Sequence, residues 1–226
     1  MSTLKRLNVP DGKARVLLVD DHPIVRQGLA ALINEQADLA VCGEAGDTQD
    51  AIAMAAAVKP HVALIDVSLG SCDGIDLIKE LRGQHPELVV LVLSMHDESV
   101  YAERALRAGA LGYVMKNEPA EKLMAAIRRV LGGEIYVSER FASRLLQRMA
   151  GSRAVTEVSP IERLSDRELQ VFRCIGQGMG VREIAEKLYL SVKTIEAHRE
   201  HIKQKLSLHS SNELLRYAVQ YTVLEQ

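Results

Sequence analysis

The sequence predicts a doubly wound α/β domain followed by a smaller all-helical domain. Short, continuous apolar runs alternate with helical patterns over the first part of the chain, and such runs are typical of parallel strands covered on both faces. They lie at 16–19, 39–42, 62–65, 88–93 and 111–115. Five strand–helix units in strict alternation predict a five-stranded parallel sheet with helices on both faces.

The domain organisation follows from where this alternation stops. The α/β pattern covers 14–133 and ends at Gly132-Gly133. Residues 134–160 are interpreted as a linker that contains a helix over 139–149. From 161 to 226 the strand runs disappear and closely spaced amphipathic helices replace them.

Composition restricts the possible functions only weakly. The 226 residues carry a net charge of −2, and from Ile161 onward ten Lys and Arg face nine Asp and Glu. For nucleic-acid binding, the local placement of the basic groups therefore matters more than the net charge. The cysteines Cys42, Cys72 and Cys174 form no metal or disulfide pattern. No apolar run reaches about 18 residues, and no signal peptide opens the chain, so we expect a cytoplasmic protein with no membrane partner.

Polar groups follow the predicted strands where each strand ends. Asp20 and Asp21 follow the first strand, Asp66 follows the third, and Ser94 and Lys116 follow the last two. Ligands of such sheets bind beyond the carboxyl ends of the strands. Grouped carboxylates form an oxygen site suited to Mg²⁺, and a lysine supplies a positive charge for a phosphoryl group. A single Asp after a strand is ordinarily a turn or a cap, but capping does not account for the whole set.

These residues identify a family resemblance. Residues 15–132 resemble the flavodoxin-like receiver domain of response regulators, and the matching motifs are Asp20-Asp21, Asp66, Asp73-Gly74, Ser94 and Gly112-Tyr113-Val114-Met115-Lys116. The resemblance implies that Asp66 is the phosphoacceptor. It also implies that Mg²⁺ is held by Asp21, Asp66 and the Ser68 carbonyl, with Asp20 acting through water. Ser94 and Lys116 would contact the phosphoryl oxygens.

Tyr113 would be the aromatic residue that changes rotamer on activation, although packing alone would also explain an aromatic residue on an edge strand. Four residues depart from the family pattern. Leu69-Gly70 replaces Met-Pro, Asn117 replaces a proline that is often cis, and Met95 replaces a small residue. We expect the bulk of Met95 to slow loss of the phosphoryl group. His22 is interpreted as part of the first helix start, with metal binding or proton transfer as the alternative.

The C-terminal part begins with a helix-start signal. Ser165 and Glu168 have the spacing of a capping box and precede an apolar face. A short helix over 181–188, a three-residue break and a longer helix over 192–206 follow the helix-turn-helix plan. Residues 163–221 resemble the LuxR-type helix-turn-helix through Leu164–Glu168, Arg182–Ala185, Ser191–His198 and Lys205-Leu206.

The longer helix is the expected DNA-contacting element. Its surface carries Arg199 as a DNA contact and the predicted phosphate contacts Lys193, Thr194, His198, Lys203 and Lys205. The predicted base readers are Glu196, Ala197, Glu200 and His201. Alternatively, Glu196 and Glu200 pair with Arg199 and Lys203 on the helix surface.

Together the two resemblances imply a NarL/FixJ-type regulator and not a dedicated enzyme. The implied partners are a sensor histidine kinase, promoter DNA and RNA polymerase, with homodimer formation on activation through a final helix at 212–221. One rival is a phosphatase with Asp66 as covalent intermediate, but such enzymes need an acid two residues later, where this chain has Ser68. The other is an adaptor whose helix-turn-helix has lost DNA affinity.

Overall fold

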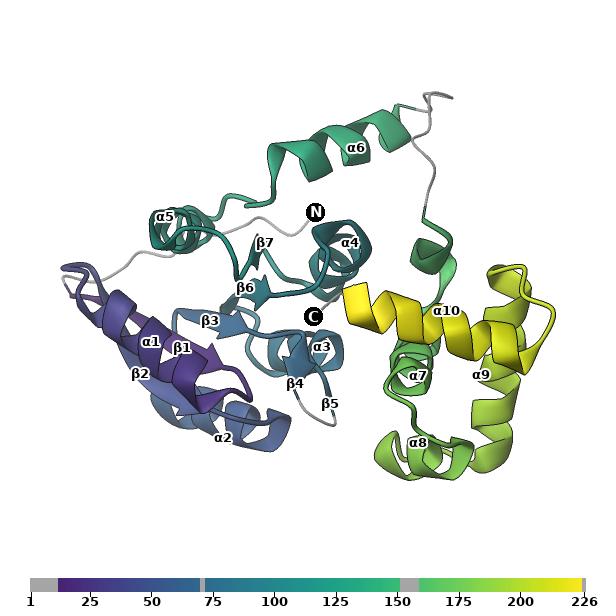
Figure 1. Cartoon of the computed structure of the whole chain (residues 1–226). Coiled ribbons are helices and arrows are strands. Elements are labelled where there is room, and N and C mark those ends of the chain that lie inside the picture. Colours follow the sequence, from purple (N-terminus) through teal and green to yellow (C-terminus); the bar gives the residue numbers. More distant parts are fainter. Residues whose placement is uncertain (1–11, 70–71, 151–158, 225–226) are drawn as a thin grey trace. The chain divides into compact units, whose positions relative to one another are not determined.

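The computed structural model describes residues 12–69, 72–150 and 159–224 (Figure 1). The chain divides into two compact units, Met1–Leu145 and Leu146–Gln226. The first unit contains the α/β pattern and the second contains the closely spaced helices, and the division falls inside 134–160, the segment interpreted from the sequence as a linker.

The first unit is built on a five-stranded parallel sheet in the order β2-β1-β3-β6-β7. The strands are β1 (Ala14–Val19), β2 (Leu39–Ala45), β3 (Val62–Ile65), β6 (Val89–Ser94) and β7 (Gly112–Met115). The helices between them are α1 (Pro23–Asn34), α2 (Thr48–Val58), α3 (Gly74–Gln84), α4 (Glu98–Ala108) and α5 (Ala120–Leu131). The predicted fold class is confirmed.

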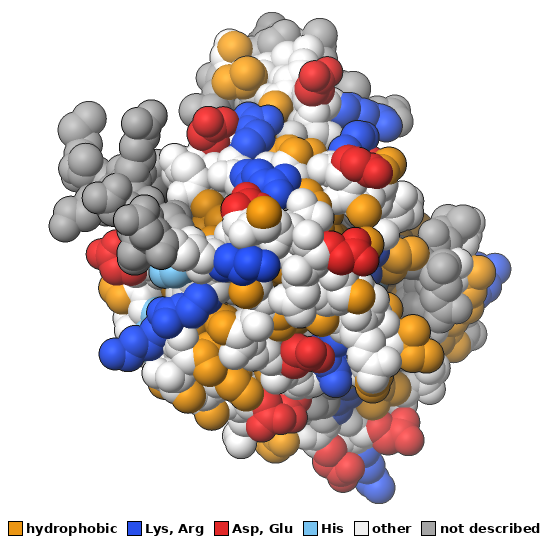
Figure 2. All heavy atoms as spheres, turned by 90° about the vertical axis from the view of Figure 1, so that its left-hand side faces the viewer, with side chains coloured by type: hydrophobic (Ala, Val, Ile, Leu, Met, Phe, Trp, Pro, Cys, Tyr) orange, Lys and Arg blue, Asp and Glu red, His pale blue; other side chains and the backbone are white. Residues whose placement is uncertain are grey.

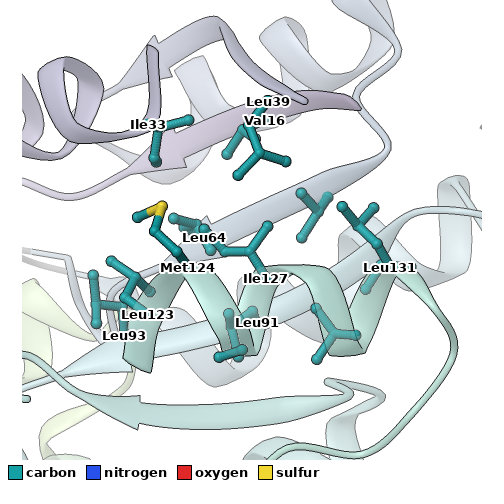
Figure 3. Close-up of a cluster of buried hydrophobic side chains, with 14 of the residues drawn as sticks. Val16, Ile33, Leu39, Leu64, Leu91, Leu93, Leu123, Met124, Ile127 and Leu131 are labelled. Atoms are coloured by element: carbon teal, nitrogen blue, oxygen red, sulfur yellow. The ribbon is translucent and has the colours of Figure 1, made fainter. Parts of the chain in front are cut away.

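A continuous hydrophobic core lies between one face of this sheet and helices α1 and α5. Figure 3 shows Leu64, Leu91 and Leu93 of the strands opposite Met124 and Ile127 of α5. Burial of each such side chain stabilises the fold by about 1.5–3 kcal/mol relative to exposure. The residues on the other side of β3 and β6, and Leu17 and Val19 of β1, are also buried, which explains why these strands appear in the sequence as apolar runs. The edge strand β2 is half-buried or exposed between its two buried ends.

The sequence did not predict a small antiparallel pair beside the main sheet. It consists of β4 (Ser68–Leu69) and β5 (Cys72–Asp73), directly after the third strand of the sheet. The predicted departure at Gly70 lies outside the described residues. Two-residue strands are too short to leave a periodic signal, so this pair is visible only in three dimensions.

The segment after α5 packs on the sheet before the next helix begins. The Tyr113 amide donates to the Tyr136 carbonyl and the Tyr136 amide donates to the Leu111 carbonyl, at 2.8 and 2.9 Å. A Cβ at Gly112 would lie 2.7 Å from the Tyr136 carbonyl oxygen, so glycine permits this approach. Helix α6 (Glu139–Met149) has the predicted bounds and buries Phe141.

Beyond the end of α6, the described residues of the second unit form a short 3₁₀ turn and four α-helices. They are η1 (Pro160–Arg163), α7 (Asp166–Gly176), α8 (Val181–Lys187), α9 (Val192–Lys205) and α10 (Ser211–Leu224). Phe172, Ile184, Ile195, Ile202 and Leu214 are fully buried and form its core. Helix α10 is longer than the predicted 212–221.

Surface charge is mixed in sign on the face of the molecule that Figure 2 draws. On the face shown in Figure 2, basic and acidic side chains lie interspersed among apolar ones. In the part of the chain that the structure describes, no helix is long and apolar enough to cross a membrane.

Two glycines of α3 provide a matched test of this fold. A Cβ at Gly74 would lie 2.4 Å from the Asp66 carbonyl oxygen and 2.7 Å from the Val67 Cα, whereas a Cβ at Gly83 would meet nothing within 4 Å. Because backbone atoms cannot move aside as a side chain does, we expect Gly74→Ala to lower the free energy of unfolding by about 1–3 kcal/mol.

Gly83→Ala should instead raise the free energy of unfolding by up to about 1 kcal/mol, because alanine favours the helix. Denaturant titrations followed by far-UV circular dichroism measure both changes. Equal stability of the two variants would contradict this account of how α3 packs against the end of β3.

Candidate functional site

The candidate site of the first unit lies where four neighbouring strands end. Asp20 follows β1, Asp66 follows β3, Ser94 is the last residue of β6, and Lys116 follows β7. The strand order places these four strands side by side, and because they are parallel their carboxyl ends meet at one edge. The structure therefore brings together side chains that are up to 96 positions apart in the chain.

The Lys116 ammonium group joins two buried carboxylates. Its Nζ lies 2.6 Å from Asp20 Oδ2 and 2.8 Å from Asp66 Oδ2, and both carboxylate side chains are only 4% exposed. Burial by itself lowers the pKa of Lys116, but the charges and hydrogen bonds of Asp66 and Asp20 outweigh it and hold the pKa above its ordinary value. Lys116 therefore stays protonated and offsets the negative charge of the pair.

The acidic residues form a cluster that suits a divalent cation. Ligand atoms of Asp20, Asp21, His22 and Asp66 all lie within 4.8 Å of one another. Carboxylate oxygens are the donors that Mg²⁺ prefers, so the donor set fits this ion. The His22 amide donates to Asp20 Oδ1 at 2.8 Å, and its ring Nδ1 lies 2.8 Å from Asp21 Oδ1.

His22 also occupies the N-cap position of α1, directly before Pro23, but its side chain caps no backbone group. The structure thus places His22 at the helix start, as predicted, and turns its ring toward the acidic cluster.

A second group of contacts surrounds His96, a residue that the sequence analysis did not single out. His96 is buried, its amide donates to Ser94 Oγ at 3.2 Å, and its ring Nε2 lies 2.5 Å from Ser68 Oγ. The Tyr113 hydroxyl donates to the His96 carbonyl at 2.7 Å. The available signal was a histidine two residues after a strand-end serine, but only the fold shows that it connects three predicted site residues.

The remaining predicted features of this site are placed as follows. Tyr113 is buried on the edge strand β7, and the Ser68 amide donates to Asp66 Oδ1 at 3.2 Å. Met95 is 50% exposed, and its expected effect on phosphoryl lifetime stays a prediction. The described residues contain no cis peptide bond, including the one after Lys116, where Asn117 stands.

In the second unit, α8 and α9 form the predicted helix-turn-helix. Ser191 caps α9 by accepting from the Thr194 amide at 3.1 Å, and Tyr189 in the turn has a left-handed φ of 54°. The exposed predicted DNA contacts on α9 are Lys193, Glu196, Ala197, Glu200, His201 and Lys205, and the half-buried ones are Thr194, His198, Arg199 and Lys203. All ten belong to one helix.

Ion pairs divide the basic side chains of α9 into two kinds. Lys203 pairs with Glu200 at 2.8 Å, which is the surface pairing that the sequence left open for Glu200. Lys205 pairs at 2.6 Å with the buried Glu168, whose capping box with Ser165 is confirmed. Lys193 has no ion pair with the described part of the chain.

Glu168 is held in its ionised form. Burial alone raises the pKa of its carboxyl group, but hydrogen bonds from Lys205 and Ser165 outweigh burial and bring that pKa below its ordinary value. Burial also lowers the pKa of His198, which therefore remains neutral at neutral pH.

Comparison with protein families agrees with this geometry. Residues 16–128 match the response regulator receiver domain, and residues 162–218 match the bacterial regulatory proteins of the luxR family. The chain belongs to the response regulators that join a receiver domain to a LuxR-type helix-turn-helix. It is a two-component response regulator with a DNA-binding domain, as the sequence predicted, and the family is not one of dedicated enzymes.

Two relatives match this regulator over nearly its whole length, and a third matches part of it. The oxygen regulatory protein NreC of Staphylococcus aureus is 38% identical over 215 residues, which are 93% of this chain and 99% of NreC. RcsB of Salmonella enterica serovar Typhimurium, solved bound to promoter rprA with the phosphomimetic BeF3-, matches with a TM-score of 0.71 and 29% identity. That match covers 92% of this chain and 99% of the RcsB chain. A LuxR family response regulator from Aurantimonas sp. SI85-9A1 is 33% identical with a TM-score of 0.57, covering 62% of this chain and 99% of that one.

The role of Lys116 in this regulator can be tested through stability. Lys116→Met leaves Asp20 and Asp66 buried together without a counter-charge, so we expect the receiver to lose about 3–5 kcal/mol of unfolding free energy. Asp66→Asn removes one negative charge and leaves Lys116 paired with Asp20, so its loss should be clearly smaller. Denaturant titration of both variants without divalent cations measures the difference, and the opposite ranking would refute the charge argument.

Proposed function

We propose that Asp66 accepts a phosphoryl group from a sensor histidine kinase and that the phosphorylated regulator binds promoter DNA through α9. The observation that carries this proposal is the position of Lys116, whose Nζ is within hydrogen-bond distance of both Asp20 and Asp66. An ammonium group held there is available to a phosphoryl oxygen as soon as one forms on Asp66.

In the proposed transfer, an Asp66 carboxylate oxygen attacks the phosphorus while the phosphorus–nitrogen bond of the donor histidine breaks. Lys116 keeps its ion pair with Asp20 and turns its second contact from Asp66 to a phosphoryl oxygen. Ser94, whose hydroxyl now accepts from the His96 amide, donates its own proton to another phosphoryl oxygen. Such pre-placed donors stabilise charge where it develops.

Mg²⁺ fits the acidic donor set and would be held by Asp21, Asp66 and the Ser68 carbonyl, with Asp20 acting through water. When bound, the ion supplies positive charge that offsets the phosphoryl oxygens. The protein's own contribution is to keep Asp66 buried beside Lys116 until a phosphodonor arrives.

The contacts of His96 suggest how the phosphoryl group changes the rest of the receiver. Ser94, Ser68 and Tyr113 each contact His96, through its amide, ring and carbonyl respectively. Drawing the Ser94 hydroxyl toward a phosphoryl oxygen breaks the first of these contacts. We infer that the His96 loop then shifts and that Tyr113, losing its acceptor, changes rotamer, which alters the α4–β7 face.

The rival activities are less well supported. A dedicated phosphatase needs an acid two residues after the nucleophile, but the residue there, Ser68, presents a hydroxyl that contacts His96. Hydrolysis of its own aspartyl phosphate is therefore the expected limit of this receiver. An adaptor whose helix-turn-helix has lost DNA affinity is less well supported, because the exposed side chain of Lys193 is available to contact a phosphate of DNA.

Dimer formation on DNA would use α10. Leu215, Val219 and Val223 are 44%, 39% and 65% exposed and recur every four residues along this helix. A stripe of this kind can pair with its own copy about a two-fold axis, which matches a palindromic DNA site. RNA polymerase is the further partner that we propose for a promoter-bound dimer. We also propose that the regulator is cytoplasmic, because promoter DNA lies in that compartment.

The phosphoacceptor assignment is tested on the full chain with a small-molecule phosphodonor and Mg²⁺. Intact mass spectrometry should show one added phosphoryl group on the wild type and none on Asp66→Asn. Asp47→Asn is the matched control, because Asp47 caps α2 after the edge strand β2 and is outside the acidic cluster, and it should be modified normally.

The same preparations also measure the coupling between phosphorylation and DNA binding. They are tested against DNA selected from a random pool. Phosphorylation should tighten binding of the wild type by about 5–150-fold and leave Asp66→Asn unchanged. Equal affinity of wild type with and without the phosphoryl group would contradict the proposed switch.

Salt dependence separates the two kinds of lysine on α9. Lys193→Gln should reduce the slope of log affinity against log salt by about 0.9, the value for one lost phosphate contact. Lys205→Gln should reduce it less, because Lys205 is paired with Glu168. Fluorescence anisotropy over a range of salt concentrations measures both slopes, and an unchanged slope for Lys193→Gln would exclude its proposed contact.

A further inference from the structure

Two histidines of α9 converge with a buried carboxylate of α7. The ligand atoms of Glu168, His198 and His201 all lie within 4.8 Å of one another. His198 and His201 are three positions apart, so their side chains share one face of the helix. Neither the receiver chemistry nor the helix-turn-helix plan requires a second histidine beside the first.

The two oxygens of Glu168 have different surroundings. Oε2 accepts from the Ser165 amide at 2.7 Å and from Lys205 Nζ at 2.6 Å. Oε1 faces the His201 ring, whose Nδ1 is 4.0 Å away. One oxygen is thus committed to the fold of the domain, and the other remains directed at the histidines.

We propose that Glu168, His198 and His201 form a binding site for a divalent transition-metal cation such as Zn²⁺. Two imidazoles and one carboxylate are a donor set that zinc uses in proteins, with a fourth position left to water. Zinc ligand bonds of about 2.0–2.1 Å would place neighbouring donor atoms roughly 3.4 Å apart in a tetrahedron. His201 Nδ1 and Glu168 Oε1, now 4.0 Å apart, would therefore close by about 0.6 Å, and any other pair of donor atoms, all within 4.8 Å, by at most about 1.4 Å.

The side chain that has to move is free to do so. The His201 side chain is 59% exposed, whereas that of Glu168 is 5% exposed and fixed by its cap and ion pair. The lowered pKa values of Glu168 and His198 give an ionised carboxylate and a neutral ring, which are the protonation states of metal ligands. The charges of Lys205 and Arg167 oppose the cation, so the site is expected to be of moderate affinity.

Occupation of this site has a consequence that rests on the proposed function. His198 and His201 are both predicted DNA contacts, and a metal ion would hold their rings against α7. The metal-bound regulator should therefore bind DNA more weakly than the metal-free one, independently of Asp66.

The site is tested with Zn²⁺ on the full chain in excess Mg²⁺, which occupies the receiver cluster, by competition with a chromophoric chelator. His201→Asn keeps the fold because His201 is exposed, and His209→Asn is the control on an exposed histidine outside the cluster. We expect His201→Asn to weaken zinc binding at least about ten-fold, a loss that even outer-shell partners cause. His209→Asn should bind zinc as the wild type does. Equal zinc affinity of His201→Asn and the wild type would overturn the proposal.

DNA binding with and without Zn²⁺ then tests the consequence. Zinc should weaken DNA binding of the wild type and of His209→Asn but not of His201→Asn. If zinc binds as predicted and DNA affinity does not change, the consequence is wrong and the site stands. If the wild type binds no DNA with or without Zn²⁺, the proposed function fails. The zinc titration still decides whether the metal site exists.

Discussion

The carboxylates of Asp20 and Asp66 are almost completely buried at neighbouring strand ends, and Lys116 contacts both of them. Two negative charges this close repel one another, and water cannot screen them well. A cation beside the two carboxylates offsets this repulsion, and Lys116 is that cation. The contacts of Lys116 join the end of β7 to the ends of β1 and β3. They also place an ammonium group where a phosphoryl group would form on Asp66.

The rest of the receiver holds these groups together at the carboxyl-end edge of the sheet. A parallel sheet in the order β2-β1-β3-β6-β7 brings four strand ends together, and the cores on its two faces hold it rigid. Gly74 adds a close approach of α3 to the backbone at Asp66, so the helix is anchored directly beside the proposed phosphoacceptor. His96 extends the same connection outward by contacting Ser68, Ser94 and Tyr113.

The helical unit repeats the same principle with different residues. Its buried carboxylate, Glu168, caps α7 and accepts a hydrogen bond from Lys205, so α7 and α9 are joined by charge as well as by apolar packing. This contact pairs Lys205, one of the basic side chains predicted to face DNA, with a carboxylate of its own domain. It also leaves the second oxygen of Glu168 turned toward His201, which is the basis of the proposed metal site.

Features set by neighbours in the chain could be predicted from the order of residues alone. Unbroken apolar runs marked the strands, strand-end groups such as Asp66 marked the site, and the Ser165–Glu168 spacing marked the start of α7, because each depends on local periodicity or on spacing within one turn. The tertiary structure alone decided which groups meet across distant segments. It paired Lys116 with both Asp20 and Asp66, buried His96 among site residues, and set His201 beside Glu168. Those contacts depend on strand order and helix packing, which link positions tens of residues apart and leave no periodic trace in the sequence.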